Sequence, residues 1–362
     1  MIPREAVRGG HSESYNFLWE KNAEEEFIYA DVISQYPDLA LSKSFPVGNF
    51  EVIIGNDLNE LEHSGGQLSW KGSEINGLIF LSVEAPQNME YPFLLYRTKD
   101  NRSVAALCSQ CAEKQIHSPC PHEGMDRFIT GVYTTLEINY ALSLNYKIIH
   151  IWEAWHWPQQ EKIFRDFMQL LLRRKVMHSG FPADISSQEE KTDYCNQVNA
   201  RLGLTCNLIL EPSQIVWDSE KRKYWKLLTC SVIGKMGQSN VFPQDVFITQ
   251  PSMLDSYLDD TKGTVETLDL INPTTLYLRL KPNKNFAQIN RSGNCAVSAY
   301  LTAFGRINMH KSVQQVVGSG ATVYSVEADA IAFSKKIGSK LPISFGHQVG
   351  DFRKEYRYEN IA

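Results

Sequence analysis

The sequence predicts an α+β fold in which β-strands carry acidic turns and longer helices lie between them. First, the apolar residues 28–30 lead directly into Asp31 and a turn that contains Pro37. Second, the apolar stretch 321–326 precedes another acidic turn, which holds Glu327 and Asp329. Third, helical patterns occupy residues 161–178, 218–234 and 295–317. Strands therefore hold the acidic residues, and helices separate them along the chain.

The remaining segments add strands and loops to this outline. Residues 56–77 are rich in Gly, Ser, Asn and Glu, which predicts loops linking strands such as 77–83. Residues 134–144 show helical periodicity after a threonine start, and the alternating strand 146–155 follows. Residues 98–127 are polar and rich in Cys and His, which indicates an excursion from the core.

Length and composition describe an ordinary globular chain. Its 362 residues, 43% hydrophobic and 21% charged, allow two or three subdomains. No apolar run approaches the roughly 18 residues that predict a membrane span, and the first residues lack the apolar core of a secretory signal. Seven cysteines, an odd number without a signal, predict an intracellular, reducing compartment with thiols free or bound to metal.

The net charge of −5 and the pI near 6.0 argue against a protein whose whole surface binds nucleic acid. Local basic channels remain compatible with this balance. The candidates are residues 173–175, residues 221–223, Lys281 and Lys284, although such charges are also typical of solvated faces.

The two acidic turns are the first candidate for chemistry. An isolated aspartate at the end of a buried strand is costly unless it meets a cation or a donor. Two such turns brought together by the fold suit a two-metal site, with ions about 3.5–4 Å apart. The structural alternative is that Asp31 merely caps a turn.

A cysteine and histidine cluster is the second candidate. Cys108, Cys111, Cys120 and His122 supply four ligands within fifteen residues, and His117 competes with them. Their number and spacing suit tetrahedral zinc, with bonds of about 2.3 Å to sulfur and 2.0–2.1 Å to nitrogen. Such a closed shell would be structural and would hold together a polar segment. The alternative is a set of unrelated thiols in a loop.

Residues 31–37, Asp-Val-Ile-Ser-Gln-Tyr-Pro, resemble the first palm motif of family B DNA polymerases, usually Asp-x-x-Ser-Leu-Tyr-Pro. Residues 45–48, Phe-Pro-Val-Gly, are similar to the Tyr-Pro-x-Gly of the protein-primed, viral and organellar branch. The polymerases of large self-synthesising DNA transposons and related viruses are more similar still. The resemblance extends from about Arg4 to Glu355.

The resemblance implies a nucleotide site with two Mg²⁺ ions. Residues 325–329, Ser-Val-Glu-Ala-Asp, resemble Tyr-x-Asp-Thr-Asp. Asp31 and Asp329 then match the direct metal ligands, and Glu327 replaces the other aspartate in a supporting place. Tyr36 would lie beneath the sugar and exclude a 2′-hydroxyl, and Ser34 would meet the triphosphate. On the residues alone, a plain core tyrosine is the commoner interpretation of Tyr36.

The resemblance continues in the predicted helix 218–234. Arg222 and Lys226 lie four residues apart, hence on one face, and both would reach triphosphate oxygens. Residues 226–237 resemble the motif Lys-x-x-x-Asn-Ser-x-aromatic-Gly-Lys, but Cys230 replaces its asparagine and Ile233 its aromatic ring. The matching Ser231, Gly234 and Lys235 would contact DNA.

Two further segments match the family. Gly9 and Gly10 resemble the Gly-Gly element between the proofreading domain and the palm, where glycines let the backbone approach template phosphates. The transposon branch commonly shows a similar Cys/His cluster, followed by Thr130-Gly131 and Thr135-x-Glu137.

The implied fold is a polymerase palm, an antiparallel sheet with packed helices, with inserted helical fingers and a small zinc-binding excursion. The expected organisation is an entry segment 1–30, palm 31–160 with the insertion 98–127, fingers 161–245, palm 246–350 with the second acidic hairpin, and a truncated start of the thumb 351–362. Exonuclease motifs and the thumb Lys-x-Tyr are missing, so a fragment or a decaying copy is expected.

The expected function is that of a DNA-directed DNA polymerase core that replicates a mobile or viral element. Its expected partners are primer-template DNA, deoxynucleoside triphosphates and a candidate terminal protein primer, with no membrane. The alternative is a catalytically impaired, zinc-stabilised polymerase relic that binds nucleic acid.

Overall fold

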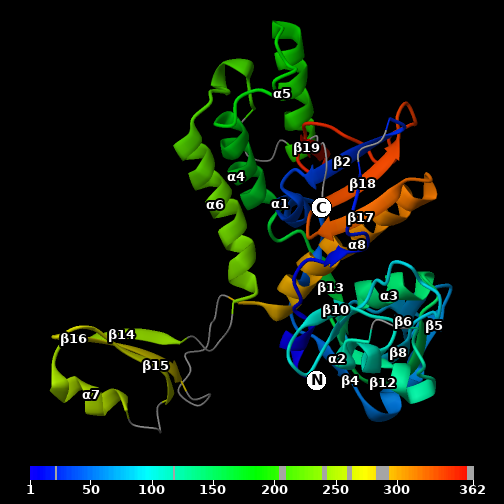
Figure 1. Ribbon diagram of the computed structural model, residues 1–362, viewed down its shortest axis with the longest axis vertical. Coiled ribbons are helices and arrows are strands. Elements are labelled where there is room, and N and C mark those ends of the chain that lie inside the picture. The colour runs from blue at the N-terminus through cyan, green and yellow to red at the C-terminus, as the bar shows by residue number, and fades with distance from the viewer. Residues whose placement is uncertain are drawn as a thin grey trace. The chain divides into compact units, whose positions relative to one another are not determined.

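The computed structural model describes residues 1–20, 23–116, 119–203, 209–238, 243–258, 263–282 and 293–356 (Figure 1). Two compact units are present: Met1–Ile233 with Cys295–Ala362, and Gly234–Asn294. His117 and Lys284, two residues singled out above, lie outside the described residues. Within the described part of the chain, no helix has the length and apolar character needed to cross a membrane.

A five-stranded antiparallel sheet forms one half of the first unit. Its strand order is β1 (Ser12–Ser14), β17 (Thr322–Glu327), β18 (Ala330–Lys336), β2 (Glu25–Val32) and β19 (Phe352–Tyr356). The expected strand before Asp31 and the expected acidic hairpin are both present. The last strand, β19, comes from the segment expected to begin the thumb.

Helix α8 (Cys295–Gly318) covers one face of this sheet (Figure 1). Because side chains alternate along a strand, Ile28, Ala30 and Val32 enter the core beneath α8. Tyr29 and Asp31 consequently lie on the opposite face. Burial of the apolar set fixes the register of β2 and with it the face that carries Asp31.

A second sheet has the order β11 (Ile129–Thr134), β8 (Gly77–Glu84), β12 (Lys147–His156) and β4 (Glu51–Ile53). Helix α3 (Thr135–Ser143) packs against it, with Ile138 in the shared core. The threonine start predicted for this helix is present, because Thr134 and Glu137 form a reciprocal capping box.

The segment expected to be loops at 56–77 is more ordered than the sequence indicated. It forms η2 (Gly55–Glu60) and a small sheet of β5 (Leu61–Ser64), β6 (Gln67–Trp70) and β7 (Ser73–Glu74). Gly65 and Gly66 both have positive φ, which lets a two-residue turn join β5 to β6. The polar residues of 56–77 therefore form a small sheet and its turns, and not loops alone.

Shorter elements also belong to the first unit. Two-stranded pairs are formed by β3 (Phe45–Val47) with β13 (Gln159–Glu161) and by β9 (Leu95–Arg97) with β10 (Ser103–Ala105). The Cys/His-rich excursion contains β10, α2 (Ser109–Lys114) and η3 (Gly124–Arg127), and η1 (Pro3–Ala6) precedes β1.

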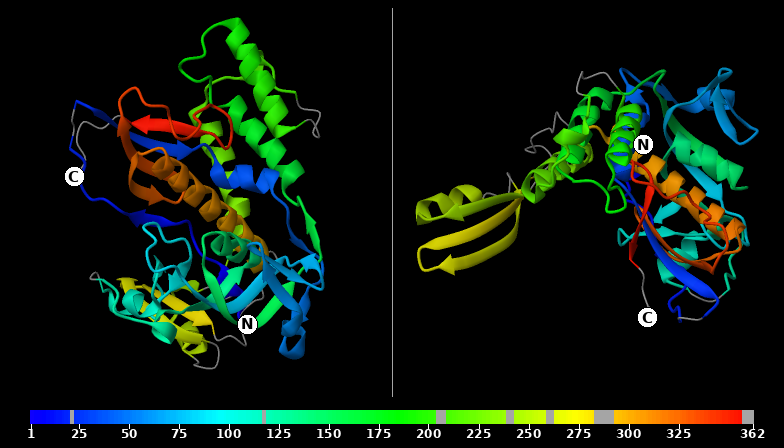
Figure 2. Two further views of the ribbon diagram at one scale, coloured as in Figure 1. Left: turned by 90° about the vertical axis from the view of Figure 1, so that its right-hand side faces the viewer. Right: turned by 90° about the horizontal axis from the view of Figure 1, so that it is seen from above.

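The helices α1 (Gln35–Ser42), α4 (Arg165–Met177) and α5 (Gln188–Leu202) lie beside one another at the end of the five-stranded sheet (Figure 2). They are followed by η4 (Pro212–Gln214) and α6 (Ser219–Met236). Tyr36 and Pro37 lie within α1 rather than in a turn. The helix α5 was not expected from the sequence.

The second unit has its own small core. The strands β14 (Gln244–Ile248), β16 (Thr275–Pro282) and β15 (Gly263–Asn272) form its sheet, and α7 (Pro251–Tyr257) packs against it. Ile248, Leu278 and Leu280 are buried there. The boundary expected between residues 245 and 246 falls within β14. The strands β15 and β16, which were expected in the palm with the acidic hairpin, belong to this second unit.

Candidate nucleotide and metal site

Two aspartates lie at the same end of the five-stranded sheet. Asp31 on β2 is paired with Ala330 on β18, the residue that directly follows Asp329. The main-chain N–H of Val32 donates to the Asp329 carbonyl at 2.8 Å. Strand pairing therefore places two acidic tips, nearly three hundred residues apart in the chain, side by side.

Burial disfavours the charged form of both carboxyl groups. Burial raises the pKa of Asp31 to about 6, and the nearby Asp329 adds to the rise. Burial also raises the pKa of Asp329, and Lys226 opposes that rise. Two half-buried like charges favour any cation that can lie between them.

The tip of the acidic hairpin is held by the segment around Gly10. Ala328 has a left-handed φ of 57°, and its N–H donates to the His11 carbonyl at 2.8 Å. A Cβ at Gly10 would lie 2.6 Å from the Ala328 Cβ and 2.9 Å from the Tyr36 hydroxyl. Only glycine therefore allows this close approach of the chain to the hairpin.

Tyr36 is packed between two glycines beside the carboxylates. A Cβ at Gly305 on α8 would lie 2.9 Å from its ring, and Gly10 meets its hydroxyl on the other side. Burial raises the pKa of Tyr36, so its hydroxyl stays protonated at neutral pH. The ring is thus held in one place at the floor of the site.

A buried ion pair anchors the Gly9 segment. The Arg306 guanidinium, which is fully buried on α8, donates to Glu137 Oε1 at 2.7 Å and to the Gly9 carbonyl at 2.6 Å. Neither residue was predicted from the sequence to lie at the site. The available signal was an arginine within a buried helix, because a buried guanidinium requires a carboxylate partner.

Lys226 on α6 lies near both carboxylates, and Lys175 on α4 lies near Lys226 and Arg222 of α6. Lys175 Nζ donates to Ser34 Oγ, and Ser34 has a left-handed φ of 55°. Burial lowers the pKa of Lys175 to about 8, helped by the nearby charges of Arg222 and Lys226. Among the described residues, no carboxylate lies within ion-pair distance of Lys175 or Arg222. Lys175 belongs to a run that was predicted as a candidate basic channel, and no contact with the nucleotide was predicted for it.

The other predicted site residues lie further out. Glu327 is exposed, and Tyr29 Oη donates to its Oε2 at 3.0 Å, on the same sheet face as Asp31. Ser231 is exposed on α6, whereas Gly234 and Lys235 belong to the second unit.

The Cys/His cluster forms a compact set of ligands. One ligand atom from each of Cys108, Cys111, Cys120 and His122 lies within 4.8 Å of all the others. The Sγ atoms lie 3.5, 3.4 and 3.7 Å from His122 Nδ1, in chain order. A zinc tetrahedron with bonds of 2.0–2.3 Å has edges of about 3.6–3.8 Å, so this donor set fits the ion.

Comparison with known proteins places the fold. Residues 2–183 match the family described as DNA polymerase type B, organellar and viral. Phi29 DNA polymerase with primer-template DNA and incoming nucleotides has a similar structure, with a TM-score of 0.59 and 13% identity over 99% of this chain and 48% of that one.

Two other phi29 structures are also similar. The complex with primer-template DNA gives a TM-score of 0.54 and 14% identity over 99% of this chain and 46% of that one. The complex with single-stranded DNA gives a TM-score of 0.54 and 13% identity over 99% of this chain and 48% of that one. The chain spans about half the length of these structures. No curated protein matches in sequence.

Proposed function

The chain belongs to the organellar and viral type B DNA polymerases, and from this premise we propose that it carries the nucleotidyl-transfer core of a DNA-directed DNA polymerase. The observation that carries this proposal is the convergence of Asp31 and Asp329 opposite a set of basic side chains. A site with paired carboxylates on one side and cations on the other matches a substrate that brings both metal ions and a polyphosphate.

Asp31 and Asp329 are the proposed magnesium ligands. Their oxygens are the hard donors that Mg²⁺ prefers, and burial raises the pKa of both groups, which a bound cation would counteract. When bound, two Mg²⁺ ions activate the primer 3′-hydroxyl and neutralise the leaving pyrophosphate. Glu327, held by Tyr29, supports the hairpin from the same face.

Arg222, Lys226 and Lys175 are the proposed triphosphate ligands. Arg222 and Lys226 project from successive turns of α6, and Lys175 approaches from α4. Ser34 accepts a hydrogen bond from Lys175 and so orients its amine. In the described part of the chain none of these three cations forms an ion pair with a carboxylate, so they can bind phosphate oxygens without first breaking one.

Tyr36 is the proposed sugar gate. Because Gly10 and Gly305 enclose it on two sides, the ring has no space to withdraw when a 2′-hydroxyl arrives. A deoxyribose fits above the ring and a ribose does not. The same packing makes the gate depend on glycine at positions 10 and 305.

Primer-template DNA and deoxynucleoside triphosphates are the proposed substrates. Gly9 and Gly10 would approach the template backbone, and Ser231, Gly234 and Lys235 would contact DNA. A terminal protein as primer, and replication of a mobile or viral element, are the proposed partner and context.

Primer extension tests this proposal. With Mg²⁺, deoxynucleotides and a defined template, Asp31→Asn and Asp329→Asn should each reduce extension by about a thousandfold or more, because several kcal/mol of metal stabilisation is lost. Asp193→Asn, an exposed aspartate on α5, is the matched control and should extend normally.

The second candidate function is a polymerase relic that binds nucleic acid without catalysis. It is favoured by Glu327 in place of an aspartate and by Cys230 in place of the motif asparagine. Template binding by the wild-type protein with no magnesium-dependent incorporation would establish it in place of the enzyme.

A structural zinc ion is the proposed occupant of the Cys/His cluster. Cys108 also caps α2, since its Sγ accepts from the Cys111 N–H at 3.5 Å. We expect about one zinc per chain by mass spectrometry. Cys111→Ser should lose the zinc and unfold at lower temperature, whereas the exposed Cys230→Ser should keep both properties. Zinc-free protein with unchanged stability would contradict the proposal.

A further inference from the structure

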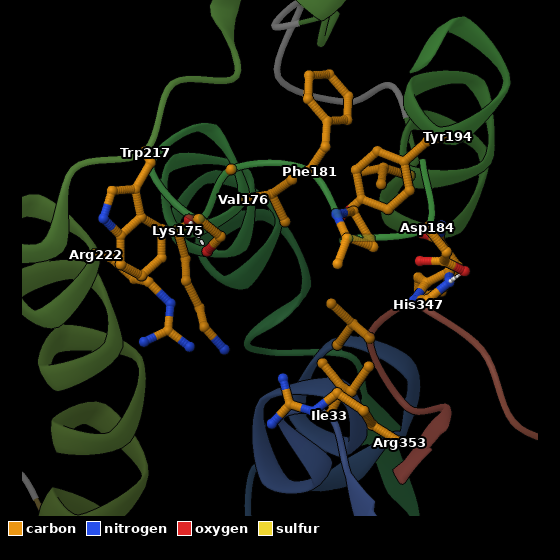
Figure 3. Close-up of a pocket in the computed structure, with 17 residues that line it drawn as sticks. Ile33, Lys175, Val176, Phe181, Asp184, Tyr194, Trp217, Arg222, His347 and Arg353 are labelled. Carbon is orange, nitrogen blue, oxygen red and sulfur yellow. Dashed lines mark hydrogen bonds and ion pairs between the residues drawn. The ribbon is translucent and has the colours of Figure 1, made fainter. Parts of the chain in front are cut away.

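A cavity of about 360 Å³ lies in the first unit, between α4, α5, α6 and the loop before β19 (Figure 3). Lys175, Arg222 and Arg353 line it with positive charge, and Phe181, Tyr194 and Trp217 line it with aromatic rings. Its volume falls within the range of sites for small organic ligands, about 300–1,000 Å³.

The cavity shares cations with the proposed triphosphate site but none of its carboxylates. Ile33 is the lining residue nearest in sequence to Asp31, and neither Asp31, Asp329 nor Tyr36 lines the cavity. A ligand held here by Lys175 and Arg222 would therefore stand apart from the metal ligands and the sugar gate.

The cationic end is suited to an anion. Lys175 is hydrogen-bonded to the neutral Ser34, and the guanidinium of Arg222 lies over the Trp217 ring at 5.8 Å. Arg353 is neutralised by Glu355. Figure 3 shows Lys175 and Arg222 together on one side, with Asp184 and His347 on the other, where His347 Nε2 and Asp184 Oδ2 lie 2.9 Å apart.

The aromatic lining is suited to a planar ring, and Figure 3 shows Trp217 on the side of Lys175 and Arg222 and Tyr194 on the side of Asp184. Trp217 is 63% exposed although it is a large apolar side chain, and it stands beside Arg222 at the cationic end. The rings of Phe181 and Tyr194 pack edge to face in the lining, with their centroids 5.8 Å apart. An exposed tryptophan can stack on a base whose phosphates are held by the neighbouring cation, and Arg222 has no carboxylate partner within the described segments.

We propose that this cavity binds a nucleoside triphosphate in a second, non-productive position, with its phosphates on Lys175 and Arg222 and its base on Trp217. This rests on the proposed function in that the same two cations serve the incoming nucleotide. The two positions therefore exclude each other. Tyr36 does not line the cavity, so ATP can bind here although the sugar gate rejects it, and it competes with deoxynucleotides.

The test compares ATP with inorganic tripolyphosphate by calorimetry, without added divalent ions. ATP should bind about tenfold more tightly, because base stacking on Trp217 adds to the phosphate contacts, and tenfold corresponds to about 1.4 kcal/mol. Trp217→Ala should abolish this difference and leave extension without ATP unchanged. Tyr224→Ala, which removes an exposed aromatic ring of α6 outside the cavity, should preserve the difference.

Equal binding of ATP and tripolyphosphate to the wild-type protein would overturn the proposal, as would an ATP preference that survives Trp217→Ala. Ala183→Trp, at an exposed lining position, provides a second variant that fills the cavity and should also remove the preference. The Asp31→Asn protein should retain ATP binding while losing extension. Normal extension by that variant would refute the proposed catalytic site and leave the ATP comparison intact.

Discussion

Two sets of charged side chains, one buried and one half-buried, lie close together in this molecule and differ in how they are paired. The side chains of Arg306 and Glu137 are 0% and 1% exposed, and Arg306 Nη2 lies 2.7 Å from Glu137 Oε1. Asp31 and Asp329 are like charges at adjoining strand ends, and Lys175 is an amine among other cations. The first set is satisfied within the fold. The second is left for a ligand to neutralise.

The paired set positions the unpaired one. Arg306 holds the Gly9 carbonyl, the neighbouring Gly10 touches the tip of the acidic hairpin at Ala328, and Gly305 packs on Tyr36. The buried Arg306–Glu137 ion pair thus helps to fix the positions of Ala328 and Tyr36 at the site. Strain at the site is visible in the left-handed φ angles of Ser34 and Ala328, two non-glycine residues.

The largest expected effect comes from breaking the paired set. Glu137→Gln should lower the free energy of unfolding by about 3–5 kcal/mol, because the Arg306 charge stays buried without its carboxylate. Glutamine keeps an oxygen that can cap α3, so the loss reports the charge. Urea unfolding measures it. A loss below about 1 kcal/mol would mean that the pair contributes no more than a surface ion pair.

The sequence predicted those parts of the fold whose signal is local. The strand before Asp31, the capped helix α3 and the hairpin at Glu327 follow from alternation and capping residues within short windows. The helix α5 was missed because its exposed face is polar and its apolar stripe is thin. Its Ser187–Glu190 capping box was the available signal.

The candidate site shows a similar division. The acidic tips were predicted to lie together, and the pairing of Asp31 with Ala330 places them there. Lys175 and Arg306 could not be assigned, because their surroundings come from α6 and α3, which are distant in sequence. A basic residue in a helix has the same local pattern whether it faces solvent, a ligand or a buried carboxylate.

The next largest effect comes from the ionisation of Lys175. As the pH rises, loss of its charge should lower activity and raise the stability of the fold. Its pKa near 8 means that the amine loses its charge above that pH in the free protein. We expect kcat/KM for deoxynucleotides to be about tenfold lower at pH 9 than at pH 7. Lys175→Arg, which stays charged, should flatten the profile. A wild-type profile that is flat to pH 9 would exclude Lys175 as a triphosphate ligand.

The same amine should stabilise the fold as pH rises. Between about pH 8 and 10.5 the unfolded chain binds the Lys175 proton more tightly than the folded chain does, so the unfolding free energy increases with pH. Lys175→Met should remove this increase in thermal unfolding measured at pH 8 and pH 10. An increase of equal size in the variant would assign it to other groups.

The smallest expected effect is that of Asp31→Asn on stability. It distinguishes the two sets most directly, because removal of the Asp31 charge should stabilise the fold. At pH 7 without added divalent ions, Asp31→Asn should raise the free energy of unfolding by about 1 kcal/mol, after allowance for solvent screening of a half-buried group. Added Mg²⁺ should raise the thermal midpoint of the wild-type protein and not that of the variant, since only the wild type gains a ligand. Asp193→Asn should change neither quantity. If Asp31→Asn instead lowered stability as Glu137→Gln does, Asp31 would be a paired structural charge, and the contrast between the two sets would fail.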